Sequence, residues 1–356
     1  MYLEHMTERA LRKGQIFNMD PLISMIVPVF NAEKYIENFI NLCSNQEYSN
    51  LEIVFIDDGS TDNTLQFIKK ACDDFNNIRV YSQKNKGPSS ARNYGLKCAI
   101  GEFVIFADVD DYIYPDYVSH LYYVIDKENA DIAFCNYKKV VNISNEITKS
   151  RKLLEDQIIS FDKIKAIKDF NYRRHLTGYS CLKLIKKEIL DGIFFPEEIV
   201  YGEDFVFTYE LLKKTDKIAY SNRICYLYWQ NINSSTHIKR DNTQKYQDAW
   251  KAHMNYLEDI ERRFPEILDG AIAKCYLLAI NDVTRVYDIA RDRMFTKELY
   301  SFIRHNAKRV MKDKESKNIV KLLGLSGMVS AKVTCNICKF IFWFMEKSNL
   351  TFSRTV

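Results

Sequence analysis

The chain has 356 residues, of which 47% are hydrophobic and 28% charged, a composition typical of a folded protein and unlike that of a disordered one. The net charge of +4 is too small for a general nucleic-acid binder, so we expect no nucleic-acid partner. The charge is unevenly distributed, because residues 301–356 hold eleven Lys or Arg against three Asp or Glu, a local net charge of +8.

Alternating strands and helices are predicted from residue 22 onward. Continuous apolar runs bounded by polar turns predict buried strands, and apolar residues three or four positions apart predict helices. Strands separated by helices imply right-handed crossovers and a mainly parallel sheet, hence an α/β fold. The predicted strands cover 23–30, 51–58, 78–83 and 101–111. The predicted helices cover 32–45 and 61–75 (capped by Ser60 or Thr61), and 87–100 is a loop that enters a helix capped by Ser89 or Ser90.

The rest of the chain is predicted to be less regular and then helical. After about residue 241 the pattern is mostly helical. We therefore expect an extension at 1–21, an α/β domain at 22–237 and a helical C-terminal region at 238–356. Between them we predict a strand at or near a sheet edge (130–141), a short helix (161–170), a strand running into a helix (178–190), a helix (202–215) and one long strand or a strand pair (218–231).

Acidic residues follow two of the predicted strands. Asp57 and Asp58 end one, and Asp108, Asp110 and Asp111 end another. Open α/β sheets bind ligands at the carboxyl ends of their strands. Clustered carboxylates repel one another unless a cation neutralises them, and a hard ion such as Mg²⁺ or Mn²⁺ bound to a diphosphate meets that need. The alternative is an acidic turn or helix start.

The chain has neither GxGxxG nor GxxxxGK[ST], the glycine-rich phosphate loops of dinucleotide-binding and P-loop proteins. A metal ion must therefore handle the phosphates of any bound nucleotide. Five segments, in order, resemble the motifs of family 2 glycosyltransferases with the GT-A fold. They are VPVFNAEKYI (27–36), IVFIDDGSTDNT (53–64), NKGPSSARNYGL (85–96), FADVDDYIYPD (106–116) and YGEDFVF (201–207).

The resemblance implies a donor site for a UDP-sugar. Asp58 would accept a hydrogen bond from the uracil N3–H, the alternative being a turn-forming role for Asp57 and Asp58. Without the resemblance, Arg92 would be interpreted as a solvated residue on the surface of a helix. The nucleotide-binding residues implied are Pro28, Val29, Phe30 and Asn31 for the base and ribose, Asn85 and Arg92 for the base, Asp108 for the ribose hydroxyls or metal-bound water, and Ser235 (or Ser234) for phosphate.

The same resemblance implies a Mn²⁺ or Mg²⁺ site. Asp108 and Asp110 match the family's DxD motif, with Asp110 as the metal ligand. Asp111 would share the metal or brace the loop. His237 would reach the metal or diphosphate, although an isolated His is more often structural. The metal would bridge both phosphates and stabilise the departing UDP.

Catalysis is expected from the pair Glu203–Asp204, which matches the family's ED motif. Asp204 would be the general base that removes a proton from the acceptor hydroxyl, and the attack opposite the leaving phosphate inverts configuration. Glu203 would support the site or bind acceptor. The alternative is helix capping, which this sequence would also provide.

We therefore expect an inverting, metal-dependent transferase that moves a hexose or N-acetylhexosamine to a saccharide acceptor on a lipid carrier, for a bacterial surface polysaccharide. A wall-polymer transferase acting on a polyol-phosphate chain would share the core motifs. A non-catalytic UDP-sugar-binding scaffold would need neither base nor metal. A sugar nucleotidyltransferase lacks support, because its Gly- and Arg-rich loop is missing near the N-terminus.

The cysteines and the basic C-terminal segment indicate where in the cell the protein acts. Nine scattered Cys and no signal peptide indicate the reducing cytoplasm. Cys335 and Cys338 form a lone CxxC without a second pair, so we predict core or interface residues and no zinc site. The basic, aromatic tail with its apolar run 340–345 suits the inner face of the cell membrane. The alternative is a helix packed on the protein or on another subunit of a homo-oligomer.

Overall fold

The computed structural model describes residues 20–147, 156–230, 243–289 and 292–347. The chain folds into two compact units, which are named unit 1 (1–163, 175–197 and 207–237) and unit 2 (164–174, 198–206 and 238–356). Two short segments that lie inside the predicted α/β domain in sequence, 164–174 and 198–206, thus belong to unit 2. The chain therefore passes between the units several times, which a single division at residue 237 does not capture.

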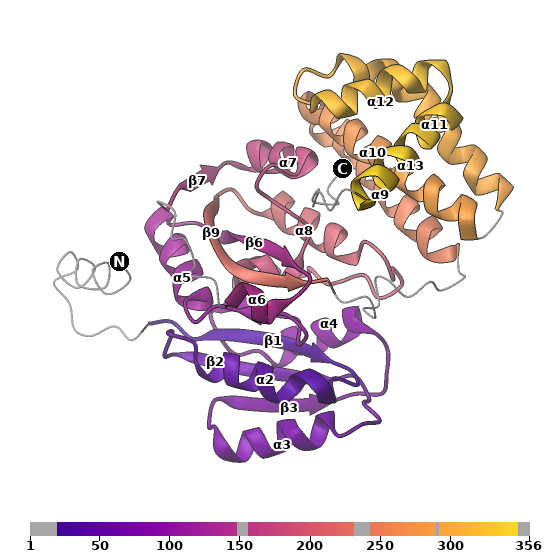
Figure 1. Ribbon diagram of the computed structural model, residues 1–356. Helices are drawn as coiled ribbons and strands as arrows, with labels where there is room; N and C mark the ends of the chain where they lie inside the picture. Colours follow the sequence, from indigo (N-terminus) through magenta and orange to yellow (C-terminus); the bar gives the residue numbers. More distant parts are fainter. Residues whose placement is uncertain (1–19, 148–155, 231–242, 290–291, 348–356) are drawn as a thin grey trace. The chain divides into compact units, whose positions relative to one another are not determined.

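The strands form one nine-stranded sheet in the described part of unit 1, in the order β3-β2-β1-β4-β8-β6-β9-β5, with β7 beside β9 (Figure 1). The α/β class is confirmed, and the sheet is mixed, because antiparallel strands join its parallel ladders. The strands β1 to β4 pair in parallel, whereas β8 is antiparallel to both β4 and β6. The bounds are β1 Ile23–Val29, β2 Leu51–Asp57, β3 Ile78–Ser82, β4 Phe103–Phe106, β5 Tyr112–Ile113, β6 Ile132–Val140, β7 Ile158–Phe161, β8 Lys183–Lys186 and β9 Ile218–Trp229.

Two strand predictions are resolved by this topology. The strand expected at or near a sheet edge, 130–141, is not an edge strand, because β8 and β9 pair with the two sides of β6. The segment 218–231 contains one long strand, β9, and not a strand pair. Sequence pattern could not show either point, since a strand's neighbours come from distant parts of the chain.

Helices cover both faces of the parallel half of the sheet. Ile53 and Phe55 of β2 share a core cluster with residues of α2 and α3, whereas Val54 and Ile56 pack with Ala91 of α4. Burial on both faces explains the continuous apolar run of this strand. The helices of unit 1 are α2 (Glu33–Ser44), α3 (Thr64–Asp74), α4 (Pro88–Cys98), α5 (Tyr117–Glu128) and α6 (Ile143–Ile147), with 3₁₀ turns η1 (Ser180–Leu182) and η2 (Lys187–Leu190).

The predicted helix caps are wrong. The N-cap of α3 is Asn63, and α4 begins at Pro88 after Gly87, so Ser89 and Ser90 lie inside the helix. Proline is favoured at a first helical position because its missing N–H would have no partner there. The left-handed conformation of Gly87, with φ +93°, turns the chain into that start.

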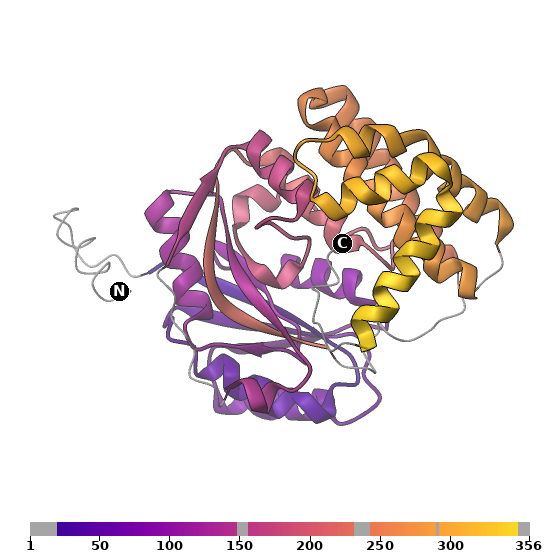
Figure 2. The same cartoon turned by 45° about the horizontal axis from the view of Figure 1, so that its top comes forward.

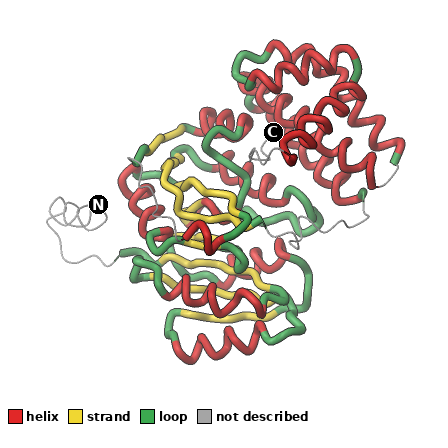
Figure 3. The backbone as a smooth tube through the Cα atoms, in the orientation of Figure 1, coloured by secondary structure: helices red, strands yellow, loops and turns green. Residues whose placement is uncertain are grey.

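Unit 2 is helical in its described residues (Figures 2 and 3). Cys335 and Cys338 are buried and unbridged, which confirms that they are core residues. Within the described ranges, no helix combines the length and apolar character that crossing a membrane requires. Its helices are most of α7 (Lys163–Tyr172), the start of α8 (Glu203–Lys214), then α9 (Gln244–Arg263), η3 (Pro265–Ile267), α10 (Leu268–Ile289), α11 (Arg293–Lys312), α12 (Asn318–Val329) and α13 (Ala331–Lys347).

We predict that Gly95→Ala destabilises the protein. A Cβ at Gly95 would lie 2.3 Å from Cγ2 of Ile26, so α4 and β1 must separate. The cost of overpacking, about 1–3 kcal/mol, exceeds the gain of about 1 kcal/mol that Ala normally brings to a helix. Chemical denaturation measures the difference. Lys97→Ala, on the exposed side of the same helix, is the control and should change stability by less than about 0.5 kcal/mol. A Gly95→Ala protein as stable as the wild type would contradict the close packing of α4 on the sheet.

Candidate functional site

The candidate site lies at one edge of the sheet in unit 1. The strand β1 lies between β2 and β4 and is parallel to both, so all three end at the same edge. The loops that follow them carry Asn31, Asp58 and Asp108. The fold thereby brings together the three groups of polar residues that the sequence pattern predicted to share one rim.

The loops after β1 and β2 are joined by hydrogen bonds. The Asn31 backbone N–H donates to Ser60 Oγ at 3.0 Å, and the Thr61 N–H donates to Asn31 Oδ1 at 2.8 Å. Asn31 has φ +48°, a left-handed conformation that Asn adopts more readily than most residues. Phe30 is 49% exposed, whereas Val29 is buried in the core cluster. Phe30 is therefore the exposed apolar side chain at the end of β1.

Asp58 is buried and holds the loop after β3. Its carboxylate accepts hydrogen bonds from the Gln83 side chain (2.8 Å) and from the backbone N–H groups of Lys86 (2.9 Å) and Gly87 (2.8 Å). A carboxylate has about four acceptor positions, so roughly one is left for a ligand. Asp57 accepts the Ser60 N–H at 3.1 Å, which is the turn-forming role.

Asn85 is exposed in the same loop, close to the turn after β2. A Cβ on Gly59 would lie 2.9 Å from the Asn85 nitrogen, and Gly59 has φ +76°. Only glycine accommodates both the conformation and the close approach. The turn after β2 and the loop after β3 are thereby packed directly on each other.

Arg92 links α4 to the acidic residues after β4. Its guanidinium donates to Asp108 Oδ1 at 3.2 Å and lies 5.3 Å from the ring centre of Phe195. The side chain is only 7% exposed, so the alternative of a solvated helix residue is wrong. Whether Arg92 contacts a nucleotide stays a prediction.

The three acids after β4 are arranged differently from one another. Ligand atoms of Asp108, Asp111 and Cys181 lie within 4.8 Å of one another, and no other such group occurs among the described residues. Asp111 is buried, and its two oxygens accept from the Tyr226 hydroxyl (2.7 Å) and the Trp229 N–H (2.8 Å). These bonds favour the bracing role for Asp111 over metal ligation.

Burial and neighbouring charges raise the pKa values of Asp110 and Asp111. Burial, followed by the charge of Asp108, raises the pKa of Asp110 to about 6. Burial and both neighbouring carboxylates raise the pKa of Asp111 well above its ordinary value. A divalent cation would relieve this repulsion, and carboxylate oxygens suit Mg²⁺ or Mn²⁺. The sulfur of Cys181 is too soft for those ions, so the fit comes from the aspartates.

Tyr226 was missed by sequence reasoning. Its hydroxyl donates to Asp111 and accepts the Asp108 N–H at 3.2 Å, so one side chain of β9 organises the acidic loop. Tyr226 and Tyr228 are two positions apart in the strand, a spacing that puts both side chains on one face. The spacing does not show which residues the Tyr226 hydroxyl contacts. Asp108 and Tyr226 are 118 positions apart in the sequence, so no local pattern reveals that contact.

Glu203 and Asp204 form the first turn of α8, within unit 2. The turn follows Gly202, which has φ +92°. The next residue, Phe205, stacks on His253 of α9 with ring centres 4.0 Å apart and on Phe170 of α7 at 5.5 Å. Burial lowers the pKa of His253 to about 3, so this ring stays neutral. The stack anchors the start of α8.

Two predicted residues, Ser235 and His237, lie in 231–242, outside the described residues. Their roles stay predictions.

Sequence comparison identifies relatives. Glycosyl transferase family 2 matches residues 24–194. An uncharacterized glycosyltransferase of Haemophilus influenzae is 34% identical over 188 residues, 48% of this chain and 75% of that protein. The glycosyltransferase GlyG of Streptococcus pneumoniae is 30% identical over 219 residues, 59% of this chain and 71% of GlyG. The poly(ribitol-phosphate) beta-N-acetylglucosaminyltransferase TarS of Staphylococcus aureus is 31% identical over 214 residues, 58% of this chain but 35% of TarS.

Solved structures share the fold. TarS residues 1–349 of S. aureus, in complex with UDP-GlcNAc, match with a TM-score of 0.57 at 22% identity, over 88% of this chain and 89% of that one. The mannosyltransferase PcManGT of Pyrobaculum calidifontis, in complex with GDP-Man and Mn²⁺, matches with a TM-score of 0.54 at 15% identity, over 92% and 86%. With the motifs in order along the strand ends and relatives matched over most of their own length, the chain belongs to family 2 of the glycosyltransferases and has the GT-A fold.

Proposed function

We propose that this glycosyltransferase moves a hexose or N-acetylhexosamine from a UDP-sugar to a saccharide acceptor with inversion and with Mn²⁺ or Mg²⁺. The observation that carries the proposal is the acidic rim, in which Asp58 and the group Asp108–Asp111 follow strands β2 and β4 on either side of β1. A donor with a base at one end and a diphosphate at the other requires a hydrogen-bond acceptor and a cation site along one edge.

The base end of the donor is assigned to the loops after β1, β2 and β3. After its three hydrogen bonds, the Asp58 carboxylate has about one acceptor position left for the uracil N3–H. Phe30, which precedes Asn31 in the loop after β1, has an exposed ring. The choice of UDP is supported by TarS, a relative that was itself solved in complex with UDP-GlcNAc. Because PcManGT was solved with GDP-Man, GDP-sugars are the alternative donors to compare with UDP-sugars.

The diphosphate end is assigned to Asp110 and Asp108, which would hold the metal. When bound, the ion supplies Lewis-acid stabilisation of the UDP leaving group. Arg92 holds Asp108 in place through their ion pair, and Tyr226 with Asp111 fixes the loop between them. Two side chains, those of Arg92 and Tyr226, thus orient the carboxylates of Asp108 and Asp111.

Asp204 is proposed as the general base. It takes the proton of the acceptor hydroxyl while that oxygen bonds to the anomeric carbon and the sugar–phosphate bond breaks, releasing UDP. Glu203 is assigned to acceptor binding or support. The stack of Phe205 on His253 and Phe170 fixes the first turn of α8 and hence the direction of its carboxylates.

The acceptor is proposed to be a saccharide on a lipid carrier, made in the cytoplasm for a bacterial surface polysaccharide. A second candidate, a polyol-phosphate wall polymer, is favoured by the 31% identity with TarS, a poly(ribitol-phosphate) transferase. Purified acceptors of both kinds distinguish the two, since the transferred sugar would be found on only one.

Asp204→Asn should abolish transfer but not donor binding. Loss of a general base costs about 10²–10⁴-fold in rate, whereas binding of UDP should change by less than about twofold. UDP release from a panel of UDP- and GDP-sugars, with crude lipid-linked acceptor and Mn²⁺, measures turnover, and calorimetry measures UDP binding. Glu203→Gln is the matched neighbour and should retain more activity. Equal turnover by wild type and Asp204→Asn would reject Asp204 as base; UDP binding without turnover of any donor by the wild type would favour a scaffold.

Asp110→Asn should stabilise the metal-free protein and remove its response to Mn²⁺. In the folded chain Asp110 keeps its proton up to about pH 6, but unfolded Asp loses it near 3.8, so unfolding releases protons between these values. Stability therefore falls as pH rises through this window, and Asn avoids that loss. Melting midpoints in chelator should favour the variant at pH 8 and converge at pH 4.

In the same experiment Mn²⁺ should raise the midpoint of the wild type at pH 8 but not that of Asp110→Asn. Asp73→Asn, an exposed change of the same charge on α3, should respond to Mn²⁺ like the wild type. A Mn²⁺ response that survives in Asp110→Asn would exclude Asp110 as a ligand.

Phe205→Leu should lower the rate of transfer without weakening UDP binding. Leu fills much of the buried volume but cannot stack on His253, so the first turn of α8 loses its fixed direction. We expect about a tenfold fall in kcat and less than about a twofold change in UDP affinity. Trp250→Phe, a buried aromatic change in α9 away from the stack, serves as the control for general effects on unit 2. An unchanged kcat in Phe205→Leu would remove the positioning role.

A further inference from the structure

Helices α12 and α13 of unit 2 each pack on the protein with one face. The buried residues follow a spacing of three and four along both helices, which defines a single inward stripe per helix. In α12 the stripe is Val320, Leu323, Gly324 and Gly327, and in α13 it is Ala331, Thr334, Cys335 and Cys338.

The outward faces of the same helices also carry apolar residues. A helix on a protein surface normally has polar residues opposite its buried stripe, because that side meets water. Here the outward residues of α12 form a second apolar stripe, and in α13 Val333 and Ile337 are exposed beside Lys332 and Asn336. We call the exposed apolar residues the α12–α13 surface: Leu322 (60% exposed), Leu325 (51%), Met328 (46%) and Val329 (81%) of α12, with Val333 (43%) and Ile337 (39%) of α13.

The charged residues of this part of the chain are mostly basic. Residues 316–347 contain five Lys and one acid, Glu346, at the end of α13. Lys317 and Lys332 are exposed at the starts of the two helices. Apolar side chains flanked by lysines match the boundary of an anionic membrane, where acyl chains lie beneath phosphate groups.

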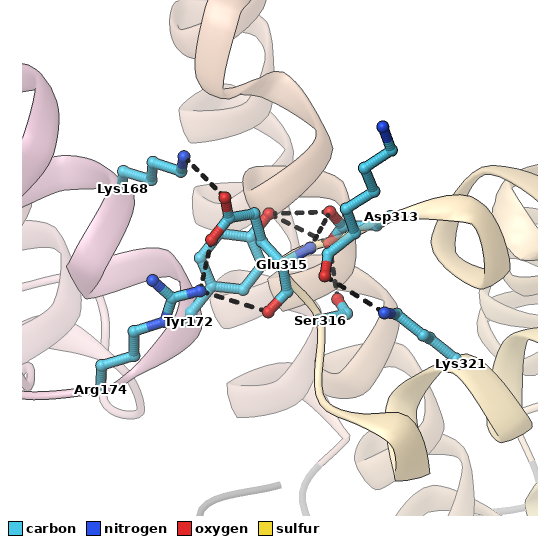
Figure 4. Close-up of polar contacts among 8 residues, drawn as sticks. Lys168, Tyr172, Arg174, Asp313, Glu315, Ser316 and Lys321 are labelled. Carbon is cyan, nitrogen blue, oxygen red and sulfur yellow. Dashed lines mark hydrogen bonds and ion pairs between the residues drawn. The ribbon is translucent and has the colours of Figure 1, made fainter.

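The acids that precede the two helices in sequence, Asp313 and Glu315, are engaged within unit 2 (Figure 4). Glu315 pairs with Arg174 at 2.6 Å and with Lys168 at 3.2 Å. Asp313 accepts from the Tyr172 hydroxyl at 3.0 Å and from Ser316 at 2.6 Å. These bonds join the connection before α12 to α7, so the outward face of α12 is held in place and its lysines keep their positive field.

We infer that the α12–α13 surface docks on an anionic lipid surface, with both helices lying in the plane of the membrane. The outward apolar residues enter the headgroup boundary and the lysines meet lipid phosphates. A second copy of the chain fits this surface less well, because a two-fold interface would set the same lysines against each other. A single residue, Ser330, connects α12 to α13, so the exposed residues of the two helices follow one another closely along the chain.

Flotation of the full chain with vesicles tests the inference. Phosphatidylcholine vesicles with phosphatidylglycerol should bind the protein, vesicles of phosphatidylcholine alone should bind it at least about tenfold more weakly, and added salt should release it. The apolar variant Leu325→Ser with Val329→Ser should lose at least about tenfold in binding. These residues are exposed, so its melting midpoint should match the wild type.

The charge variant Lys317→Glu with Lys332→Glu should also lose at least about tenfold, since each lysine contributes about fivefold. Lys69→Glu with Lys70→Glu, an equal charge change on exposed positions of α3 in unit 1, should bind as the wild type does. Equal binding by all variants, or no preference for anionic vesicles, overturns the inference. A wild-type dimer that the apolar variant converts to monomer, with vesicle binding unchanged, assigns the surface to a second copy instead.

No donor or acceptor is present in these vesicle measurements, so their outcome is independent of the proposed function. Transfer to a soluble acceptor analogue should be unaffected in the apolar variant. If the variant loses transfer to lipid-linked acceptor alone, the surface delivers the enzyme to its substrate.

Discussion

The repulsion between carboxylates at one edge of the sheet is the constraint on which the rest of the site depends. Parallel strands that lie side by side end at the same edge, so β2 and β4 bring five aspartates to the loops on either side of β1. Burial there raises the pKa values of Asp110 and Asp111. Such a concentration of acids persists because each has a specific partner or a cation to meet.

The partners divide the acids into braces and candidate ligand groups. Asp57 closes its turn, Asp111 is bound through both oxygens, and Asp58 holds the next loop while keeping about one acceptor position. The Asp108 carboxylate is paired with Arg92, and burial together with the charge of Asp108 raises the pKa of Asp110 to about 6. The hydrogen-bond partners of these acids therefore distinguish structural carboxylates from candidate ligand groups, which motif position alone does not do.

Within unit 2, packed aromatic rings and buried hydrogen bonds hold the connections between helices in place. The neutral, buried His253 supplies a flat surface for Phe205, which fixes the turn that carries Glu203 and Asp204. The bonds of Asp313 and Glu315 to α7 similarly fix the entrance to α12. In both places a connection between elements is held by side chains distant in sequence, so that an exposed face is presented in one orientation.

The sequence by itself determined the alternating elements, the α/β class, the family motifs and the acidic rim, because hydrophobic period and strand-end chemistry are local properties. It also identified Cys335 and Cys338 as core residues. Tertiary structure alone decided that β6 is internal, that Asp111 is bound by Tyr226 and Trp229, that Arg92 is buried against Asp108, and that α12 has an apolar outward face. Those facts depend on which distant segments meet, and neither spacing nor composition encodes such contacts.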